Sequence, residues 1–244
     1  MEIYIRFYEE LNDFLSHTRR KQQFSVSVRG SPSIKHLIES LGVPHTEVDL
    51  ILVNGKSVPF SYIIQDKDRI SAYPMFEAFD IATVLRLRPK PLRTPQFILD
   101  THLGKLAKHL RMLGFSALYR NDYNDHEIVQ LSLAEKRTIL TRDRKLLIRK
   151  DVIRGYWVRN SDPPKQLQEV LTRFDLLNLI NPFSLCIVCN GRLEKIGKEK
   201  LQKKISPEIY SRFEEFFVCS TCGKIYWKGT HYKAMTQFIN TPMT

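Results

Sequence analysis

Four cysteines in the last quarter of the chain have the spacing of metal ligands. They form two pairs, Cys186/Cys189 and Cys219/Cys222, and two residues separate the members of each pair. A turn of this length lets two thiolates reach one tetrahedral ion, so the two pairs together predict one zinc site with four cysteine ligands. Because four thiolates fill the coordination shell, we expect the zinc to be structural rather than catalytic.

Two other uses of these cysteines fit the sequence less well. A redox-active CxxC motif needs one pair, whereas the chain has two pairs and no spare cysteine. Two disulfides would need an oxidising compartment, and the N-terminus shows no basic segment followed by an apolar one that would export the chain. The 29 residues between the pairs exceed the usual zinc-ribbon spacing and predict an inserted helix at about 207–216.

Three aspartates in the middle of the chain are candidates for a catalytic metal site. Asp100, Asp125 and Asp143 each come just after a predicted strand or at the start of the next helix. Such positions meet at the carboxyl edge of a parallel sheet, where ligands bind. Crowded carboxylates repel one another unless a cation compensates, and Mg²⁺ or Mn²⁺ accept such oxygen ligands. One or two of these ions would activate water for attack on phosphorus.

Each aspartate also has a simpler interpretation, because aspartate is a common helix N-cap. For a single aspartate we favour the N-cap, but three of them in a basic stretch of the chain indicate a metal-dependent nuclease. Asp122, Glu127 and Asp162 are further acidic candidates. Their spacing alone does not decide which of them completes the site.

The elements predicted around these aspartates alternate between strand and helix. The predicted strands are 97–99, 115–119, 138–141 and 156–159. Predicted helices cover 103–113, 145–150 and 164–174. A further helix, between the first two of these, begins with a capping box of Asn124 and Glu127. This alternation is typical of a parallel α/β sheet.

The N-terminal segment, residues 1–80, has the pattern of a β-grasp, or ubiquitin-like, domain. Apolar alternation predicts strands near 3–7, 24–28, 50–53 and 70–73, and a helix at 34–41 lies between the second and the third. Residues 51–55 and 68–74 resemble the sulfur-carrier proteins of thiamin and molybdopterin synthesis. Those carriers need a free C-terminal Gly-Gly, which this chain lacks because it continues at residues 76–79. We therefore expect a docking or stabilising module with a candidate protein partner.

The distribution of charge separates this domain from the rest of the chain. Lys and Arg number 38 against 26 Asp and Glu, and the net charge is −2 over residues 1–80, +9 over 81–184 and +5 over 185–244. A basic surface of this kind is typical of nucleic-acid binding, because neutralising phosphates releases condensed counterions. The alternative is a generic basic surface. Since no apolar run approaches about 18 residues, we expect no membrane span.

Several motifs between residues 95 and 235 resemble the PIN-like RNase family named after the C-terminal domain of the Mut-seven exonuclease. They are FILD (97–100), LGKLA (103–107), LRMLGF (110–115), ILTRDR (139–144), QLQEV (166–170), both CxxC pairs, and YWKGTH (226–231). The resemblance implies a PIN-like α/β core joined to a zinc ribbon, in some members preceded by a ubiquitin-like domain. It also implies that Asp100, Asp125 and Asp143 form the acidic site of a metal-dependent ribonuclease.

Several basic side chains near this site are candidates for contacting the RNA backbone, although each is also explained as a surface charge. They are Lys105, Lys108, Arg111, Arg142, Arg144, Lys145 and, after the second cysteine pair, His231.

We therefore predict an α/β protein in five parts. They are a β-grasp domain (1–80), a basic linker (81–94), a PIN-like core (95–180), a zinc ribbon (181–235) and a C-terminal tail (236–244). The expected activity is hydrolysis of RNA, for example tRNA or another structured RNA, and the expected location is the cytoplasm. The rival interpretation is a non-catalytic RNA-binding or ribosome-associated adaptor. Cleavage of DNA is a further possibility, because phosphate contacts do not distinguish the sugars.

Overall fold

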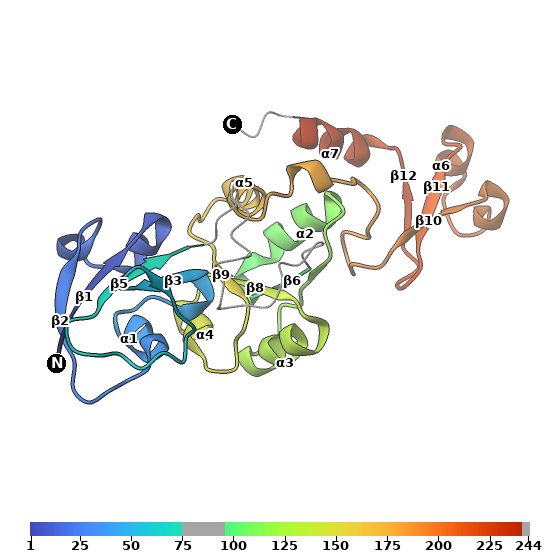
Figure 1. Ribbon diagram of the computed structural model, residues 1–244. Helices are drawn as coiled ribbons and strands as arrows, with labels where there is room; N and C mark the ends of the chain where they lie inside the picture. The colour runs from blue at the N-terminus through green and yellow to red at the C-terminus, as the bar shows by residue number, and fades with distance from the viewer. Residues whose placement is uncertain (75–95, 241–244) are drawn as a thin grey trace. The chain divides into compact units, whose positions relative to one another are not determined.

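The computed structural model describes residues 1–74 and 96–240 (Figure 1). The predicted basic linker, 81–94, lies outside the described residues. Within them the chain forms two compact units, residues 1–74 with 129–157 and residues 96–128 with 158–240. None of the described helices combines the length and the apolar character needed to cross a membrane.

The N-terminal region has the β-grasp fold that its pattern predicts. Its sheet has the order β2-β1-β5-β3-β4, in which β1 pairs antiparallel with β2 and parallel with β5. The elements are β1 (Glu2–Phe7), β2 (Phe24–Ser27), α1 (Ile34–Ser40), β3 (Leu50–Val53), β4 (Lys56–Ser57) and β5 (Arg69–Tyr73), with 3-10 turns η1 (Glu9–Phe14), η2 (His17–Arg19) and η3 (His45–Glu47).

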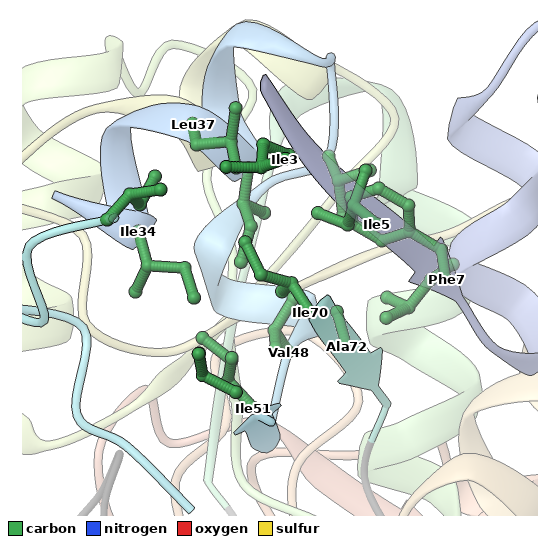
Figure 2. Packing of buried hydrophobic residues seen from close by; sticks show 14 of the residues in the cluster. Ile3, Ile5, Phe7, Ile34, Leu37, Val48, Ile51, Ile70 and Ala72 are labelled. Atoms are coloured by element: carbon green, nitrogen blue, oxygen red, sulfur yellow. The ribbon is translucent and has the colours of Figure 1, made fainter. Parts of the chain in front are cut away.

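Alternation along the strands builds the core of this region. Ile3, Ile5 and Phe7 of β1 are buried on one face of the sheet, and α1 covers that face with Ile34 and Leu37 (Figure 2). The period of two in a strand and of 3.6 in a helix brings both apolar faces together. Burial of these side chains therefore determines the register between β1 and its neighbours.

Local capping groups define where α1 and the first hairpin begin and end. The Ser33 side chain accepts a hydrogen bond from the His36 N–H and caps α1, and Gly42 follows the helix with φ of 89°. Asn54 and Gly55 both have positive φ, at 49° and 79°, which suits the two-residue turn between β3 and β4.

Asp68 is a buried polar hub of the β-grasp domain. It is 3% exposed, and its carboxylate accepts hydrogen bonds from Asn54 Nδ2 (2.9 Å), the Tyr62 hydroxyl (3.0 Å) and the Gln65 N–H (2.9 Å). These bonds join the β3–β4 turn to the loop before β5. A buried carboxylate with three donors stabilises the fold only while all three remain paired.

The α/β part contains the strands and helices that the alternating pattern predicts. Its parallel sheet has the strand order β7-β6-β8-β9. The elements are β6 (Phe97–Leu99), η4 (Thr101–Leu103), α2 (Gly104–Met112), β7 (Ala117–Leu118), α3 (Asp125–Glu135), β8 (Thr138–Thr141), α4 (Arg144–Ile148), β9 (Gly155–Trp157), α5 (Pro163–Arg173) and η5 (Leu177–Leu179).

Strand β7 is shorter than the predicted 115–119, because the end of α2 uses the first of these residues. Gly114 has φ of 92°, its N–H bonds to the Arg111 carbonyl, and the Phe115 N–H bonds to the Leu110 carbonyl. This is a Schellman motif, in which the residue after the glycine still belongs to the helix cap. Strand pairing therefore begins only at Ala117.

Strand β9 also ends before the predicted Arg159. The Arg159 and Asn160 N–H groups donate to the carboxylate of Glu169 on α5, at 2.8 Å and 3.0 Å. The backbone at this point is thus bound by a side chain rather than by another strand.

The C-terminal region is a three-stranded antiparallel ribbon with helices around it. The sheet order is β10-β11-β12. The elements are β10 (Leu193–Ile196), η6 (Lys198–Leu201), α6 (Pro207–Arg212), β11 (Phe216–Cys219), β12 (Ile225–Trp227) and α7 (Thr230–Asn240). The inserted helix is present, but it ends before the predicted residue 216, because Phe216 pairs with Ile196 and Trp227 in the sheet.

Helix α7 extends through part of the segment that the sequence assigns to a tail. Aromatic contacts account for this helix: Tyr232 packs on Phe183 and Phe238 stacks on His109, with ring centroids 4.5 Å and 4.8 Å apart. These partners are distant in sequence, so the local pattern gave no sign of them.

Replacing Asp68 with Asn tests the polar hub. The amide has one acceptor oxygen for three donors, so we expect the free energy of unfolding to fall by about 1–3 kcal/mol. Urea titration followed by circular dichroism measures this. Asp66→Asn is the matched control, because the exposed Asp66 accepts one hydrogen bond, from the Glu2 N–H, which an amide oxygen can keep. Equal losses in both variants would contradict the assignment.

Candidate metal centre and candidate active site

The four cysteine thiols form one cluster, and none of them is in a disulfide. All four sulfur atoms lie within 4.8 Å of one another. The Sγ atoms of Cys186 and Cys222 are 3.7 Å apart, and those of Cys189 and Cys219 are 3.3 Å apart. Around a tetrahedral zinc with Zn–S bonds of about 2.3 Å, sulfur atoms are roughly 3.8 Å apart. The cluster therefore has the size that a single ion with four sulfur ligands requires.

Each cysteine pair lies in a tight turn closed by a backbone hydrogen bond. The Asn190 N–H donates to the Cys186 carbonyl (2.9 Å), and the Gly223 N–H donates to the Cys219 carbonyl (3.0 Å). Asn190 and Gly223 both have φ of 71°, a left-handed conformation that asparagine and glycine adopt at low cost. The residue after each CxxC motif thus allows the turn that brings its two thiols together.

Backbone N–H groups make the thiols of the cluster unequal. Burial alone raises the pKa of Cys219, but the N–H groups of Cys222 and Thr221, 3.5 Å and 3.4 Å from its sulfur, outweigh burial and lower that pKa to about 6. Burial raises the pKa of Cys189 to about 12. Neighbouring thiolates repel one another, and a bound cation would remove this repulsion.

Tyr226 contacts the cluster from β12. Its hydroxyl lies 3.0 Å from the sulfur of Cys186. Burial raises the pKa of Tyr226, and the neighbouring Cys186 raises it further, so the phenol keeps its proton and donates a hydrogen bond to the sulfur. For Cys186, burial raises the thiol pKa, but the hydrogen bonds from Tyr226 and from the backbone of Cys189 and Val188 outweigh burial and lower it.

The first cysteine turn is bound directly to β7, an outer strand of the α/β sheet. The Ala117 N–H donates to Asn190 Oδ1 (2.8 Å), and Asn190 Nδ2 donates to the Ser116 hydroxyl (3.0 Å). Arg111 on α2 donates from Nε to the Ala117 carbonyl (2.7 Å) and from Nη1 to the carbonyls of Ile187 (3.2 Å) and Val188 (2.8 Å). The cysteine turn and the sheet edge therefore share a hydrogen-bond network.

This network corrects the expectation that Arg111 contacts RNA. Arg111 is 3% exposed, and its guanidinium donates to three backbone carbonyls. Burial lowers its pKa, but the group stays charged at any physiological pH. The side chain has no surface left for a phosphate, and it holds the first cysteine turn against α2 and β7.

Asp100 lies at the carboxyl end of β6 and is buried. It is 8% exposed, its Oδ1 accepts a hydrogen bond from the Thr101 hydroxyl (3.1 Å), and its Oδ2 lies 3.4 Å from His102 Nδ1. The side chain makes no capping bond to the turn that follows. The N-cap interpretation therefore does not account for Asp100.

The acidic candidates around α3 have different surroundings. Asn124 and Glu127 form the predicted capping box, in which each side chain accepts the other's backbone N–H at 3.0 Å. Asp122 makes a two-bond ion pair with Arg120, at 2.9 Å and 2.7 Å. Asp125 is exposed in the first turn of α3. Local partners thus hold Asp122 and Glu127.

Asp143 and Asp162 are helix N-caps. Asp143, after β8, accepts the Lys145 N–H at 2.8 Å, and Asp162, before α5, accepts the Lys165 N–H at 3.4 Å. Among the residues that the structure describes, the four cysteines are the one group of three or more close-packed side chains able to hold a metal. The composition of the acidic site stays a prediction.

The remaining basic candidates are at the surface, with one exception. Lys105, Lys108, Arg142, Lys145 and His231 are exposed. Arg144 is half-buried instead, and its guanidinium lies 3.8 Å from the centre of the Trp157 ring. Arg144 therefore contacts the protein interior beside Asp143.

Sequence reasoning missed Asn190 and Tyr226, which support the cysteine cluster. An Asn-Gly pair directly after a CxxC motif indicates a left-handed turn, and this signal could have identified Asn190. Tyr226 lies four residues after Cys222 in β12, and no local pattern indicates its contact with Cys186.

Family models match both parts of the chain. Residues 95–239 match the Mut7-C RNAse domain, and residues 1–80 match the Mut7-C ubiquitin domain. No curated protein matches the chain. A crystal structure of SAMP1 from Haloferax volcanii is similar to this chain with 13% sequence identity and a TM-score of 0.26, over 32% of this chain and all of SAMP1.

Replacing Arg111 with Met tests the network between α2, β7 and the cysteine turn. The variant keeps the apolar stem but leaves three carbonyls without their donor, so we expect the free energy of unfolding to fall by about 1–3 kcal/mol. Lys108→Met, an exposed position on the same helix, is the control and should change stability by less than about 0.5 kcal/mol. Thermal and urea unfolding measure both, and an Arg111→Met protein as stable as wild type would contradict the assignment.

Proposed function

This chain belongs to the Mut7-C RNAse domain family, and we propose that it is a ribonuclease that hydrolyses RNA phosphodiesters with a divalent metal ion. The observation that carries the proposal is the family match over residues 95–239, which includes the α/β elements and the cysteine cluster. The net charge of +9 over residues 81–184 supports binding of a polyanion.

We assign the acidic site to Asp100, Asp125 and Asp143. Asp100 follows β6 directly, Asp125 opens α3 and Asp143 follows β8, and the carboxyl ends of parallel strands are where α/β proteins bind ligands. A bound Mg²⁺ or Mn²⁺ would supply charge stabilisation at the scissile phosphate.

We assign the exposed basic side chains to contacts with the phosphates of the RNA backbone. Arg142 and Lys145 are exposed on either side of Asp143, and Lys105 and Lys108 are exposed on α2. Phosphate contacts of this kind position an RNA without reading its sequence. The thiol cluster is assigned one structural zinc, held by Cys186, Cys189, Cys219 and Cys222, and the compactness of the four sulfur atoms supports this.

Cleavage of labelled single-stranded and structured RNA by the purified chain tests the activity. We expect cleavage with Mn²⁺ or Mg²⁺, none with EDTA, and a loss of about 100-fold or more in Asp100→Asn and Asp143→Asn, because each weakens binding of the cation that would stabilise charge at the phosphate. Asp151→Asn is the matched control, since Asp151 is partly exposed and paired with Arg149.

Two outcomes would contradict the assignment in different ways. An Asp143→Asn protein that cuts RNA at the wild-type rate would show that the acidic site is elsewhere. A folded, zinc-loaded wild type that binds RNA but does not cut it in the presence of any divalent ion would instead support a non-catalytic RNA-binding adaptor.

Metal analysis tests the zinc assignment. We expect one zinc per purified chain, lost in Cys219→Ser and retained in the neighbouring Ser220→Ala. Because zinc binds the folded chain, its removal by a chelator should lower the free energy of unfolding by on the order of 4 kcal/mol or more. Full stability and an unchanged melting temperature in metal-free protein would contradict a structural zinc.

A further inference from the structure

Strand β9 is an outer strand of the α/β sheet, and a side chain from the β-grasp domain binds its backbone. The Trp157 N–H donates to Glu47 Oε1 at 2.5 Å. Glu47 is 1% exposed at the end of η3, 110 residues earlier in the chain. A carboxylate at this position satisfies a backbone donor that the sheet leaves open at its edge.

A second buried polar contact joins η3 to the segment before β9. His45 Nε2 lies 2.8 Å from the Val152 carbonyl, and because a carbonyl only accepts, Nε2 is the donor. His45 Nδ1 lies 2.7 Å from Glu39 Oε1, and the ring meets Phe60 edge-on. Two residues of η3, His45 and Glu47, therefore bind the backbone before β9 and at its last residue.

An aromatic and cationic stack completes the contact. Trp157 packs against the apolar core of the β-grasp domain, and its ring centroid is 5.1 Å from that of Phe14. The Arg144 guanidinium lies 3.8 Å from the Trp157 ring centre and 5.1 Å from that of Phe14. Such cation–π contacts hold a guanidinium in one place when it is partly desolvated.

This stack holds the backbone on both sides of Asp143. Trp157 Nε1 donates to the Arg142 carbonyl at 3.3 Å, and its ring contacts the side chain of Arg144. Asp143 itself is fixed by its own N–H, which donates to Thr141 Oγ1, and by its cap on the Lys145 N–H, both at 2.8 Å. The β-grasp domain binds Trp157, and Trp157 binds the residues before and after Asp143.

From these contacts we propose that the β-grasp domain is a positioning element of the nuclease, which fixes Asp143 through Trp157. Glu47 and Phe14 are the positioning residues, and neither touches the RNA. The proposal rests on the ribonuclease function proposed above. It gives the ubiquitin-like domain of this chain an intramolecular task, for which no free C-terminus is needed.

The test compares two variants of the docking face with matched changes. Glu47→Ala removes the acceptor for the Trp157 N–H, and Phe14→Leu keeps an apolar side chain but removes the ring. Glu47→Gln keeps an acceptor oxygen and is the conservative rescue. Glu2→Ala removes a carboxylate of the same domain that pairs with Lys67 at 2.8 Å and accepts a hydrogen bond from the Tyr4 hydroxyl at 3.4 Å.

Two readouts separate positioning from a general loss of structure. The first is RNA cleavage by the full chain in Mn²⁺. We expect kcat to fall about tenfold or more in Glu47→Ala and Phe14→Leu with KM nearly unchanged, because a small displacement of a catalytic group slows the reaction without weakening binding. The second is Trp157 fluorescence in a Trp227→Phe background, which should shift to longer wavelength in the same two variants. Glu47→Gln and Glu2→Ala should match wild type in both.

The outcomes are distinguishable. Glu47→Ala and Phe14→Leu proteins that cut RNA at the wild-type kcat overturn the positioning role alone, whether or not the Trp157 emission shifts. An equal fall of kcat in Glu2→Ala also overturns it, because the effect would then not be specific to the docking face. A wild-type protein that cuts no RNA overturns the proposed function and the positioning role with it.

Discussion

The outer strands of a short parallel sheet carry backbone groups that the sheet itself cannot pair, and side chains from the cysteine turn, helix α2 and the β-grasp domain supply the partners. On β7, Asn190 and Arg111 bind the N–H and carbonyl of Ala117. On β9, Glu47 binds the N–H of Trp157. Unpaired edges invite association with other chains, and buried unpaired groups cost stability. The cysteine turn and the β-grasp domain therefore complete the hydrogen bonding of the sheet at its two edges.

Charged side chains bind backbone groups at both edges of the sheet, Arg111 of α2 at β7 and Glu47 of the β-grasp domain at β9. Arg111 links the core to the carbonyls between Cys186 and Cys189. A change in the cysteine turn moves the acceptors of a buried guanidinium, which cannot lose its charge. Hydrogen bonds to charged groups are stronger than neutral ones, and removal of one partner leaves the other buried and unpaired.

Much of the fold follows from local patterns in the sequence. The period of two predicted β1, and the capping box of Asn124 and Glu127 predicted the start of α3, because each signal acts within a few residues. The cysteine cluster was equally predictable, since the spacing of each pair closes its own turn. Where Phe115 was assigned to a strand, the cap of α2 took precedence, and Arg111 was misassigned because a basic residue on a helix gives no local sign of burial.

The sequence by itself determined most of the elements, the four cysteines of the cluster and the family, because these depend on residue types at short spacing. Only the tertiary structure decided which side chains bind the sheet edges and what surrounds Asp100 and Asp143. The partners of Trp157, Val152 and Ala117 lie 110, 107 and 73 residues away along the chain. No periodicity extends over such distances, and the contacts exist only because the folded chain buries these groups together and requires each buried donor to find an acceptor.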